Sequence, residues 1–142
     1  APDLSLTIVT HSLPAAAVLA EHPRIEAVVV GGRLFKSARA AVGVATVDAY
    51  RLLRPDLCIL GAAGIHPEAG VTTFDGEEAE VKRAMAAHAA RVAVVTASEK
   101  LGTVAPHLIT PAGRLTHLIT DSAATDDLLA PYREMGVEVV TA

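Results

Sequence analysis

The 142-residue sequence has few aromatic residues, one cysteine and no long hydrophobic run. Aromatic side chains make up 3% of the chain and tryptophan is absent, so aliphatic residues and alanine must fill the core. Cys58 is the only cysteine and lies in an apolar segment, which excludes an internal disulfide or a thiolate metal cluster and predicts a buried side chain. Because no apolar stretch reaches the roughly 18 residues of a membrane span and no signal peptide is evident, we expect a cytoplasmic protein without membrane contact.

The chain also lacks an excess of positive charge. Its formal net charge is −4 at pH 7, whereas binding to nucleic acid needs a basic surface, so this segment alone should not bind duplex DNA specifically. Hydrophobic residues make up 51% and charged residues 20%, which favours a packed core over disorder. The length predicts one domain over residues 1–142, and a start at Ala-Pro-Asp rather than methionine indicates a piece of a longer protein.

Apolar segments alternate with segments of helical character along the chain. Most of the apolar segments are continuous, which is typical of strands covered on both faces of a parallel sheet. We therefore predict an α/β domain with three layers and a mainly parallel sheet, in which Leu57–Ala62 and Arg91–Thr96 are interior strands. The other predicted strands are Leu4–Thr10, Ile25–Val30, Leu115–Thr120 and Val137–Thr141.

Capping residues mark the starts of several helices. Ser12 precedes a helix with Pro14 in its first turn, and Asp75 with Glu78 has the spacing of a capping box. Either Thr125 or Asp126 can cap the last helix. The predicted helices are Ala15–Glu21, Thr46–Leu53, Gly76–Ala90 and Asp127–Met135, whereas Arg33–Val42 is predicted as a loop or short strand and Thr103–Arg114 as the longest loop.

A loop of small residues carries the strongest functional signal. Gly61 and Gly64 lie in this loop and let a ligand approach the backbone. Thr72 and Thr73 follow in a Gly-Val-Thr-Thr turn before the Gly76–Ala90 helix, whose N-terminus adds positive potential. This layout predicts a site for a small anionic ligand at the carboxyl ends of parallel strands. An ordinary strand-to-helix turn with a cap fits the two threonines equally well.

Charged side chains close to the same loops are further candidates. Lys100 follows a strand, where it either binds an anion or carbonyl oxygen or is a solvated loop lysine. Glu80 lies in the first turns of a helix and points either at the ligand or into solvent. Lys82 is four residues from Glu78, a spacing that predicts a surface ion pair rather than a ligand contact.

Four residues near the N-terminus also follow strands. Thr10 and Ser12 lie at the end of the first predicted strand, and Gly31 and Gly32 after the second permit close approach of a ligand or another backbone. The six histidines form no zinc-binding pattern, and the chain has neither a G-x-S-x-G elbow nor a Walker loop. We therefore predict no catalytic residue, metal or cofactor.

Six segments occur in an order that points to a known family. They are Leu6–Ser12, Val28–Arg33, Leu60–Ile65, Gly70–Thr73, Glu78–Met85 and Ser98–Gly102. Together they span nearly the whole chain and resemble the C-terminal effector domain of DeoR-family transcriptional repressors. The resemblance implies a fold similar to ribose-5-phosphate isomerase and CoA-transferases, and a sensor rather than an enzyme.

The same resemblance implies a ligand and partners. The ligand would be a phosphorylated sugar that modulates operator binding, and the domain would form a homo-oligomer. Operator DNA would be read by an N-terminal winged helix-turn-helix, so we expect this chain to be truncated, without that domain and without the family's first strand and phosphate loop.

Two positions depart from the family pattern. Ala63 stands where the family often has aspartate, and His11 stands where it usually has asparagine. A sugar-phosphate isomerase is an alternative, although Ala63 removes a carboxylate that could move a proton. An oligomerisation module that no longer binds a ligand is a further alternative.

Overall fold

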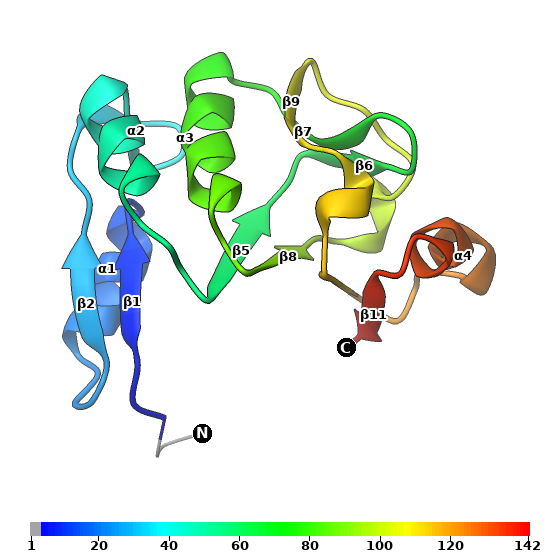
Figure 1. The fold of residues 1–142 in the computed structure, drawn as a ribbon, viewed down its shortest axis with the longest axis horizontal. Helices are drawn as coiled ribbons and strands as arrows, with labels where there is room; N and C mark the ends of the chain where they lie inside the picture. Colours follow the sequence, from blue (N-terminus) through cyan, green and yellow to red (C-terminus); the bar gives the residue numbers. More distant parts are fainter. Residues whose placement is uncertain (1–3) are drawn as a thin grey trace. The chain divides into compact units, whose positions relative to one another are not determined.

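The structure, a computed structural model, describes residues 4–142 and consists of two compact units. The first unit ends at Tyr50 and the second begins at Arg51. Figure 1 shows the helices and strands that build them. Strands joined by helices build both units and the largest sheet is entirely parallel, which confirms the predicted α/β class with a mainly parallel sheet. No helix among residues 4–142 is long and apolar enough to cross a membrane.

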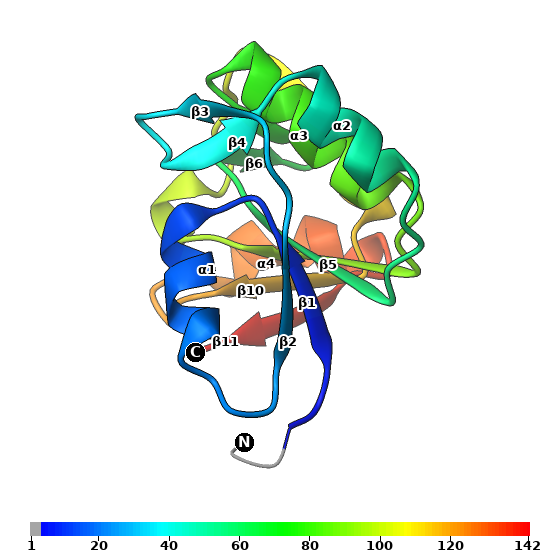
Figure 2. The same ribbon diagram turned by 90° about the vertical axis from the view of Figure 1, so that its left-hand side faces the viewer.

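Two pairs of strands and two helices form the first unit. They are β1 (Thr7–Thr10), α1 (Leu13–Ala20), β2 (Glu26–Val29), β3 (Arg33–Phe35), β4 (Ala40–Val42) and α2 (Val44–Arg51). The strands β1 and β2 pair in parallel with α1 alongside, and β3 and β4 form a hairpin where a loop or short strand is predicted (Figure 2). Ser12 caps α1 as predicted, because its hydroxyl accepts a hydrogen bond from Ala15 N–H at 3.3 Å.

The second unit contains a parallel and an antiparallel sheet. Its elements are β5 (Leu57–Gly61), β6 (Gly64–His66), β7 (Gly70–Thr73), α3 (Gly76–Ala87), β8 (Arg91–Val95), the 3-10 helix η1 (Ser98–Lys100), β9 (His107–Thr110), the 3-10 helix η2 (Ala112–Arg114), β10 (His117–Thr120), α4 (Asp126–Glu134) and β11 (Glu138–Thr141). The parallel sheet has the order β11-β10-β8-β5, and the antiparallel sheet has the order β6-β7-β9. Asp75 caps α3 and Thr125 caps α4, as their side chains predict.

One face of the parallel sheet packs against the core of the second unit. Alternate residues of β5 and β8 lie on this face, namely Cys58, Leu60, Val92 and Val94, and all four are buried. They belong to one cluster with Leu129 and other buried residues of α3 and α4. Burying a valine or leucine side chain contributes roughly 1.5–3 kcal/mol. This packing fixes the strands from which the candidate site's loops leave.

The strand β5 lies at an edge of its sheet, so the prediction that it is interior is wrong. It pairs with β8 on one side, and Leu57 and Ile59 are 41% and 59% exposed. A continuous apolar run predicts burial on both faces, but composition does not reveal how many neighbours a strand has. The strand β8 lies between β5 and β10, as predicted.

The antiparallel sheet replaces a predicted turn and a predicted loop. Gly70–Thr73 is the strand β7, because its β-branched residues pair with β6 on one side and β9 on the other. Gly70 has a φ of 84°, and a Cβ there would lie 2.6 Å from the Thr110 carbonyl oxygen, so only glycine fits. The predicted loop at 103–114 contains β9 and η2.

The thiol of Cys58 is expected to be unreactive in the folded chain. Burial raises its pKa to about 11, which the Arg114 charge only partly opposes. The native chain should therefore not react with a disulfide reagent at about pH 8, whereas the unfolded chain should react with one equivalent. Because the folded pKa lies above the ordinary value of 9.0, stability should fall as the pH rises from 9.0 towards about 11. Rapid labelling of the native chain would contradict this burial.

Candidate functional site

The loop after β5 lies against a helix and the segment that follows η1. Gly61 ends β5, and its carbonyl oxygen accepts a hydrogen bond of 3.0 Å from Lys82 Nζ on α3. Lys82 also pairs with Glu78 at 3.2 Å, which is the predicted ion pair. Gly64 is buried, and a Cβ there would lie 2.7 Å from the Thr103 carbonyl oxygen. Glycine at position 64 therefore allows the segment after η1 to approach the loop.

Lys100 is the last residue of η1 and directly precedes the segment that approaches the loop. Leu101 forms a β-bridge with Ile65, and Gly102 N–H donates to the Ile65 carbonyl oxygen at 2.7 Å. Lys100 is half-buried, and no hydrogen bond or ion pair joins its ammonium to another residue in the described part of the chain. An ammonium beyond the carboxyl end of a parallel strand keeps its charge available for an anionic ligand.

Thr72 and Thr73 are buried in β7 rather than exposed in a turn. The Thr72 hydroxyl donates to the Gly64 carbonyl oxygen at 3.3 Å and accepts from Ala105 N–H at 2.8 Å. Thr73 is buried beside it in the strand, and Glu80 is exposed on α3. The structure thus brings Gly64 and Thr72 together close to the segment after η1, and no contact found in residues 4–142 joins Glu80 to them.

Replacing Thr72 by valine is expected to destabilise the chain. Valine has nearly the same shape, but it leaves the Gly64 carbonyl oxygen and Ala105 N–H without the hydroxyl that serves both. An unsatisfied buried polar group costs about 1–3 kcal/mol, so the free energy of unfolding in urea should fall by that amount. Thr141→Val, on an exposed side chain of β11, is the control and should change stability by less than about 0.5 kcal/mol. Unchanged stability of Thr72→Val would leave the hydroxyl free for a ligand.

The four predicted residues of the first unit lie near the ends of β1 and β2. The Thr10 hydroxyl accepts a hydrogen bond from Ser12 N–H at 3.1 Å, and the Ser12 hydroxyl caps α1. The Gly31 carbonyl oxygen accepts from the Thr46 hydroxyl at 2.8 Å, and a Cβ on Gly32 would lie 2.0 Å from that hydroxyl. These contacts give each of the four a structural role, and their contact with a ligand stays a prediction.

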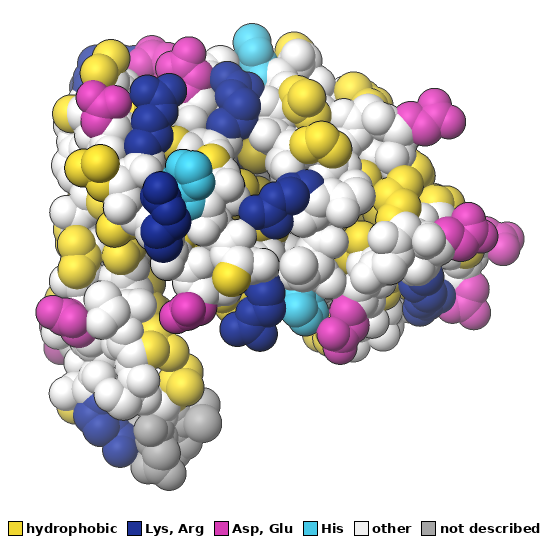
Figure 3. All heavy atoms as spheres, in the orientation of Figure 1, with side chains coloured by type: hydrophobic (Ala, Val, Ile, Leu, Met, Phe, Trp, Pro, Cys, Tyr) yellow, Lys and Arg dark blue, Asp and Glu magenta, His cyan; other side chains and the backbone are white. Residues whose placement is uncertain are grey.

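A hollow of about 290 Å³ lies at the carboxyl end of the parallel sheet. It is lined by the ends of β8 and β10 and by Ala142, and none of its lining residues is basic. Acidic side chains gather over α4 (Figure 3), whose first turn holds Asp126 and Asp127. The residues that line the hollow therefore offer no positive charge to an anionic ligand.

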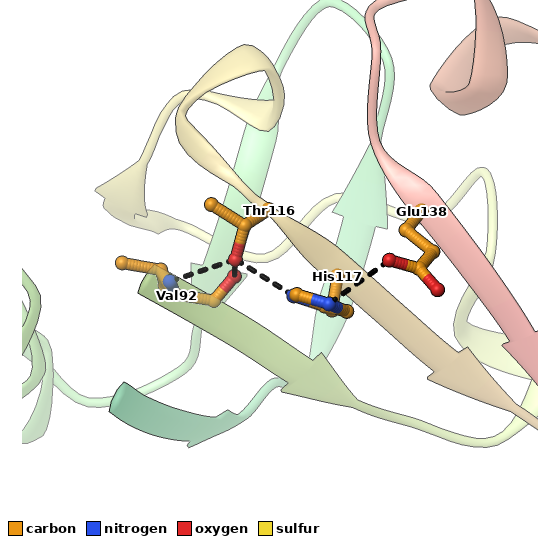
Figure 4. Close-up of polar contacts among 4 residues, drawn as sticks. All are labelled: Val92, Thr116, His117 and Glu138. Atoms are coloured by element: carbon orange, nitrogen blue, oxygen red, sulfur yellow. Dashed lines mark hydrogen bonds and ion pairs between the residues drawn. The ribbon is translucent and has the colours of Figure 1, made fainter. Parts of the chain in front are cut away.

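A hydrogen-bonded chain at the opposite end of the strands has a structural role. His117 Nδ1 lies 2.9 Å from the Thr116 hydroxyl and His117 Nε2 lies 3.2 Å from the Glu138 carboxylate (Figure 4). The order of hydroxyl, imidazole and carboxylate is that of a hydrolase triad. The Thr116 hydroxyl, however, bonds to the backbone N–H and carbonyl of Val92, each at 3.0 Å, so it links strands instead of attacking a substrate. No group of three or more metal-ligating side chains occurs among residues 4–142.

Two charged residues that were not predicted as site residues from the sequence contribute to the framework of the site. Lys82 is predicted as an ion-pair partner only, and its contact with Gly61 joins residues 21 positions apart, which the local pattern does not reveal. Asp121 accepts hydrogen bonds from two loops at the carboxyl end of the sheet. Its place directly after a predicted strand is the signal that could have identified it.

The chain matches the family described as the DeoR C terminal sensor domain over residues 1–122. The HTH-type transcriptional regulator GolR of Listeria innocua is 28% identical over 94% of this chain and 53% of its own length. The putative aga operon transcriptional repressor of Escherichia coli O157:H7 is 30% identical over 92% of this chain and 49% of its own. The glycerol-3-phosphate regulon repressor of Escherichia coli K12 is 32% identical over 69% of this chain and 39% of its own length.

The chain spans about half the length of the first two of these relatives. The family match covers most of the chain and extends over both units. The relatives are transcriptional regulators and repressors, as the six ordered segments of the sequence predict. The chain therefore belongs to the family of DeoR C-terminal sensor domains.

Proposed function

We propose that the chain is the ligand-sensing part of a DNA-binding transcriptional repressor and that its ligand is a phosphorylated sugar. The observation that carries this proposal is half-buried Lys100, whose ammonium has no hydrogen-bond or ion-pair partner in the described part of the chain. The names of two relatives from Escherichia coli K12, a glycerol-3-phosphate regulon repressor and a deoxyribose operon repressor, support a ligand of this class. Such a repressor acts on DNA, which places it in the cytoplasm.

The ligand site proposed for the second unit lies where the loop after β5 meets the segment after η1. Lys100 supplies the positive charge for the phosphate, and Gly61 admits the ligand to the backbone of the loop. A Cβ on Gly61 would meet no atom within 4 Å, so the space beside this residue is open. Among the predicted contacts, Gly61 and Lys100 are the ones that the geometry supports best, whereas buried Gly64 packs against Thr103. The buried Thr72 hydroxyl supports this loop, because it bonds to the Gly64 carbonyl oxygen and to Ala105 N–H.

Calorimetric titration tests this proposal with a small panel of compounds. The panel contains glycerol 3-phosphate, deoxyribose 5-phosphate, glucose 6-phosphate and inorganic phosphate, with glycerol and glucose as unphosphorylated controls. We expect saturable binding of at least one phosphorylated sugar or polyol and none of the controls. Binding of the unphosphorylated compounds alone would contradict the proposal. Interconversion of an aldose phosphate and a ketose phosphate would instead favour an isomerase, which Ala63 does not support because it lacks a carboxylate.

Contact with operator DNA is assigned to a winged helix-turn-helix outside this chain, in keeping with the net charge of −4. The chain itself is expected to form a homo-oligomer. Among residues 4–142, no strand pairs with the outer edge of β5, and its exposed Leu57 and Ile59 are apolar, a combination that proteins normally cover. Light scattering across a range of concentrations should show self-association. A monomer at every concentration would contradict this expectation.

A further inference from the structure

Asp121 joins two loops at the carboxyl end of the parallel sheet. It is the first residue after β10, which neighbours β8. Its Oδ2 accepts a hydrogen bond from Ser98 N–H at 2.7 Å, and its Oδ1 accepts one from Ala123 N–H at 3.0 Å. Each carboxylate oxygen therefore serves a different loop, and the one bonded to Ser98 holds the start of η1.

The helix η1 has no capping side chain of its own. Its N-cap residue is Ala97, which makes no side-chain hydrogen bond, so the first N–H groups need an acceptor from elsewhere. Asp121 supplies that acceptor from the neighbouring strand. Hydrogen bonds from the Ser98 backbone and side chain lower the pKa of Asp121, so the cap stays negatively charged at neutral pH.

A second clamp holds the other end of the same segment. Leu101 forms a β-bridge with Ile65 in β6, and Gly102 N–H donates a hydrogen bond to the Ile65 carbonyl oxygen. Lys100 lies between this clamp and the Asp121 clamp, and neither clamp uses its ammonium. The backbone from which the lysine extends is thus fixed on both sides.

We propose that Asp121 is a positioning residue of the ligand site and that its carboxylate holds η1 so that the Lys100 ammonium meets the phosphate of the ligand. The inference rests on the proposed function, because it concerns the same site. Asp121 acts through Lys100 and does not itself contact the phosphate, whose negative charge it would repel.

A double-mutant cycle tests this role with the phosphorylated compound of the panel that binds most tightly. Asp121→Ala should weaken binding roughly tenfold, the effect of losing a charge-assisted hydrogen bond. Once Lys100→Ala is present, adding Asp121→Ala should cost little further affinity, because the two residues act as one unit. Asp121→Asn keeps one acceptor oxygen and should recover part of the loss. Asp127→Ala, which removes an exposed carboxylate from the first turn of α4, is the matched control and should bind like the wild type.

Hydrogen exchange gives a readout that does not depend on any ligand. In Asp121→Ala, the amides of Ser98 to Gly102 should exchange roughly tenfold faster than in the wild type, while the amides of β8 keep their protection. Unchanged exchange in η1, unchanged affinity, or full additivity with Lys100→Ala would each overturn the role of Asp121. Failure of the wild type to bind any compound of the panel, with faster exchange in Asp121→Ala, would overturn the proposed ligand and leave the clamp itself established.

Discussion

Replacing Lys100 by alanine is expected to weaken the binding of a phosphorylated sugar roughly 10- to 150-fold. A charge-assisted hydrogen bond contributes about 1.5–3 kcal/mol, which converts to that range of affinity. The full effect is expected because the Lys100 ammonium has no hydrogen bond or ion pair within residues 4–142 that would compete with a ligand. Calorimetric titration of the wild type and the variant measures the ratio directly.

The chain offers one matched control and one comparison, because its other lysines are Lys36 and Lys82. Lys36 is exposed in the turn of the β3–β4 hairpin, so Lys36→Ala removes the same charge and should leave affinity unchanged. Lys82→Ala should have an intermediate effect, because its ammonium already bonds to Glu78 and the Gly61 carbonyl oxygen. Equal affinities of Lys100→Ala and the wild type would remove Lys100 from the site. A larger loss in Lys82→Ala would assign the phosphate to that lysine.

Replacing Leu60 by alanine is expected to lower the free energy of unfolding by about 2–5 kcal/mol, the usual range for a buried leucine. Leu60 is 1% exposed on the covered face of β5 and belongs to the core of the second unit. Its neighbour Ile59 points to the other face and is 59% exposed, so Ile59→Ala should cost less than about 1 kcal/mol. Urea unfolding of both variants gives the comparison.

This pair of variants tests whether β5 is an edge strand or an interior strand of the parallel sheet. If β5 were an interior strand covered on both faces, Ile59→Ala and Leu60→Ala would destabilise the chain to a similar extent. A loss of more than about 2 kcal/mol in Ile59→Ala would therefore restore the prediction made from the sequence. A small loss in Ile59→Ala beside a large one in Leu60→Ala supports an edge strand with one covered face.

Local signals in the sequence predicted the main helices well. Ser12, Asp75 and Thr125 cap α1, α3 and α4 because a side-chain oxygen beside a helix start satisfies backbone N–H groups whatever the rest of the chain does. The strands β8 and β10 were likewise evident from their apolar content, which is confirmed within a few residues at their ends. Such features depend on neighbours in the sequence.

Features that depend on distant partners could not be predicted. The strands β6, β7 and β9 have three or four residues each. Although β6 and β7 form a local hairpin, β7 also pairs with β9, which lies far away in the sequence. The position of β5 at an edge likewise depends on which strands reach it. Composition carries neither kind of information.

The candidate site was predicted in part for the same reasons. The glycine loop and Lys100 stood out because small residues and a cation followed apolar strands, and the structure brings the Gly64 part of that loop against the segment after η1. Thr72 was predicted to lie in a turn, whereas its hydroxyl is buried. The sequence does not reveal this, because its partner Ala105 lies 33 positions away. Asp121 and Ser98 are 23 positions apart, and only the folded sheet shows that they meet.

The most direct test of the central claim is a two-dimensional amide NMR titration of the isotopically labelled chain with the phosphorylated compound that binds most tightly. We predict that the largest shift changes fall on Gly61, Gly64 and residues 98–102, at the carboxyl end of the parallel sheet. The amide shifts of residues at its amino end, among them Thr116 and Glu138, should not change. Shift changes confined to that amino end, or none at saturating ligand, would contradict the claim that this loop and Lys100 form the sensor's ligand site.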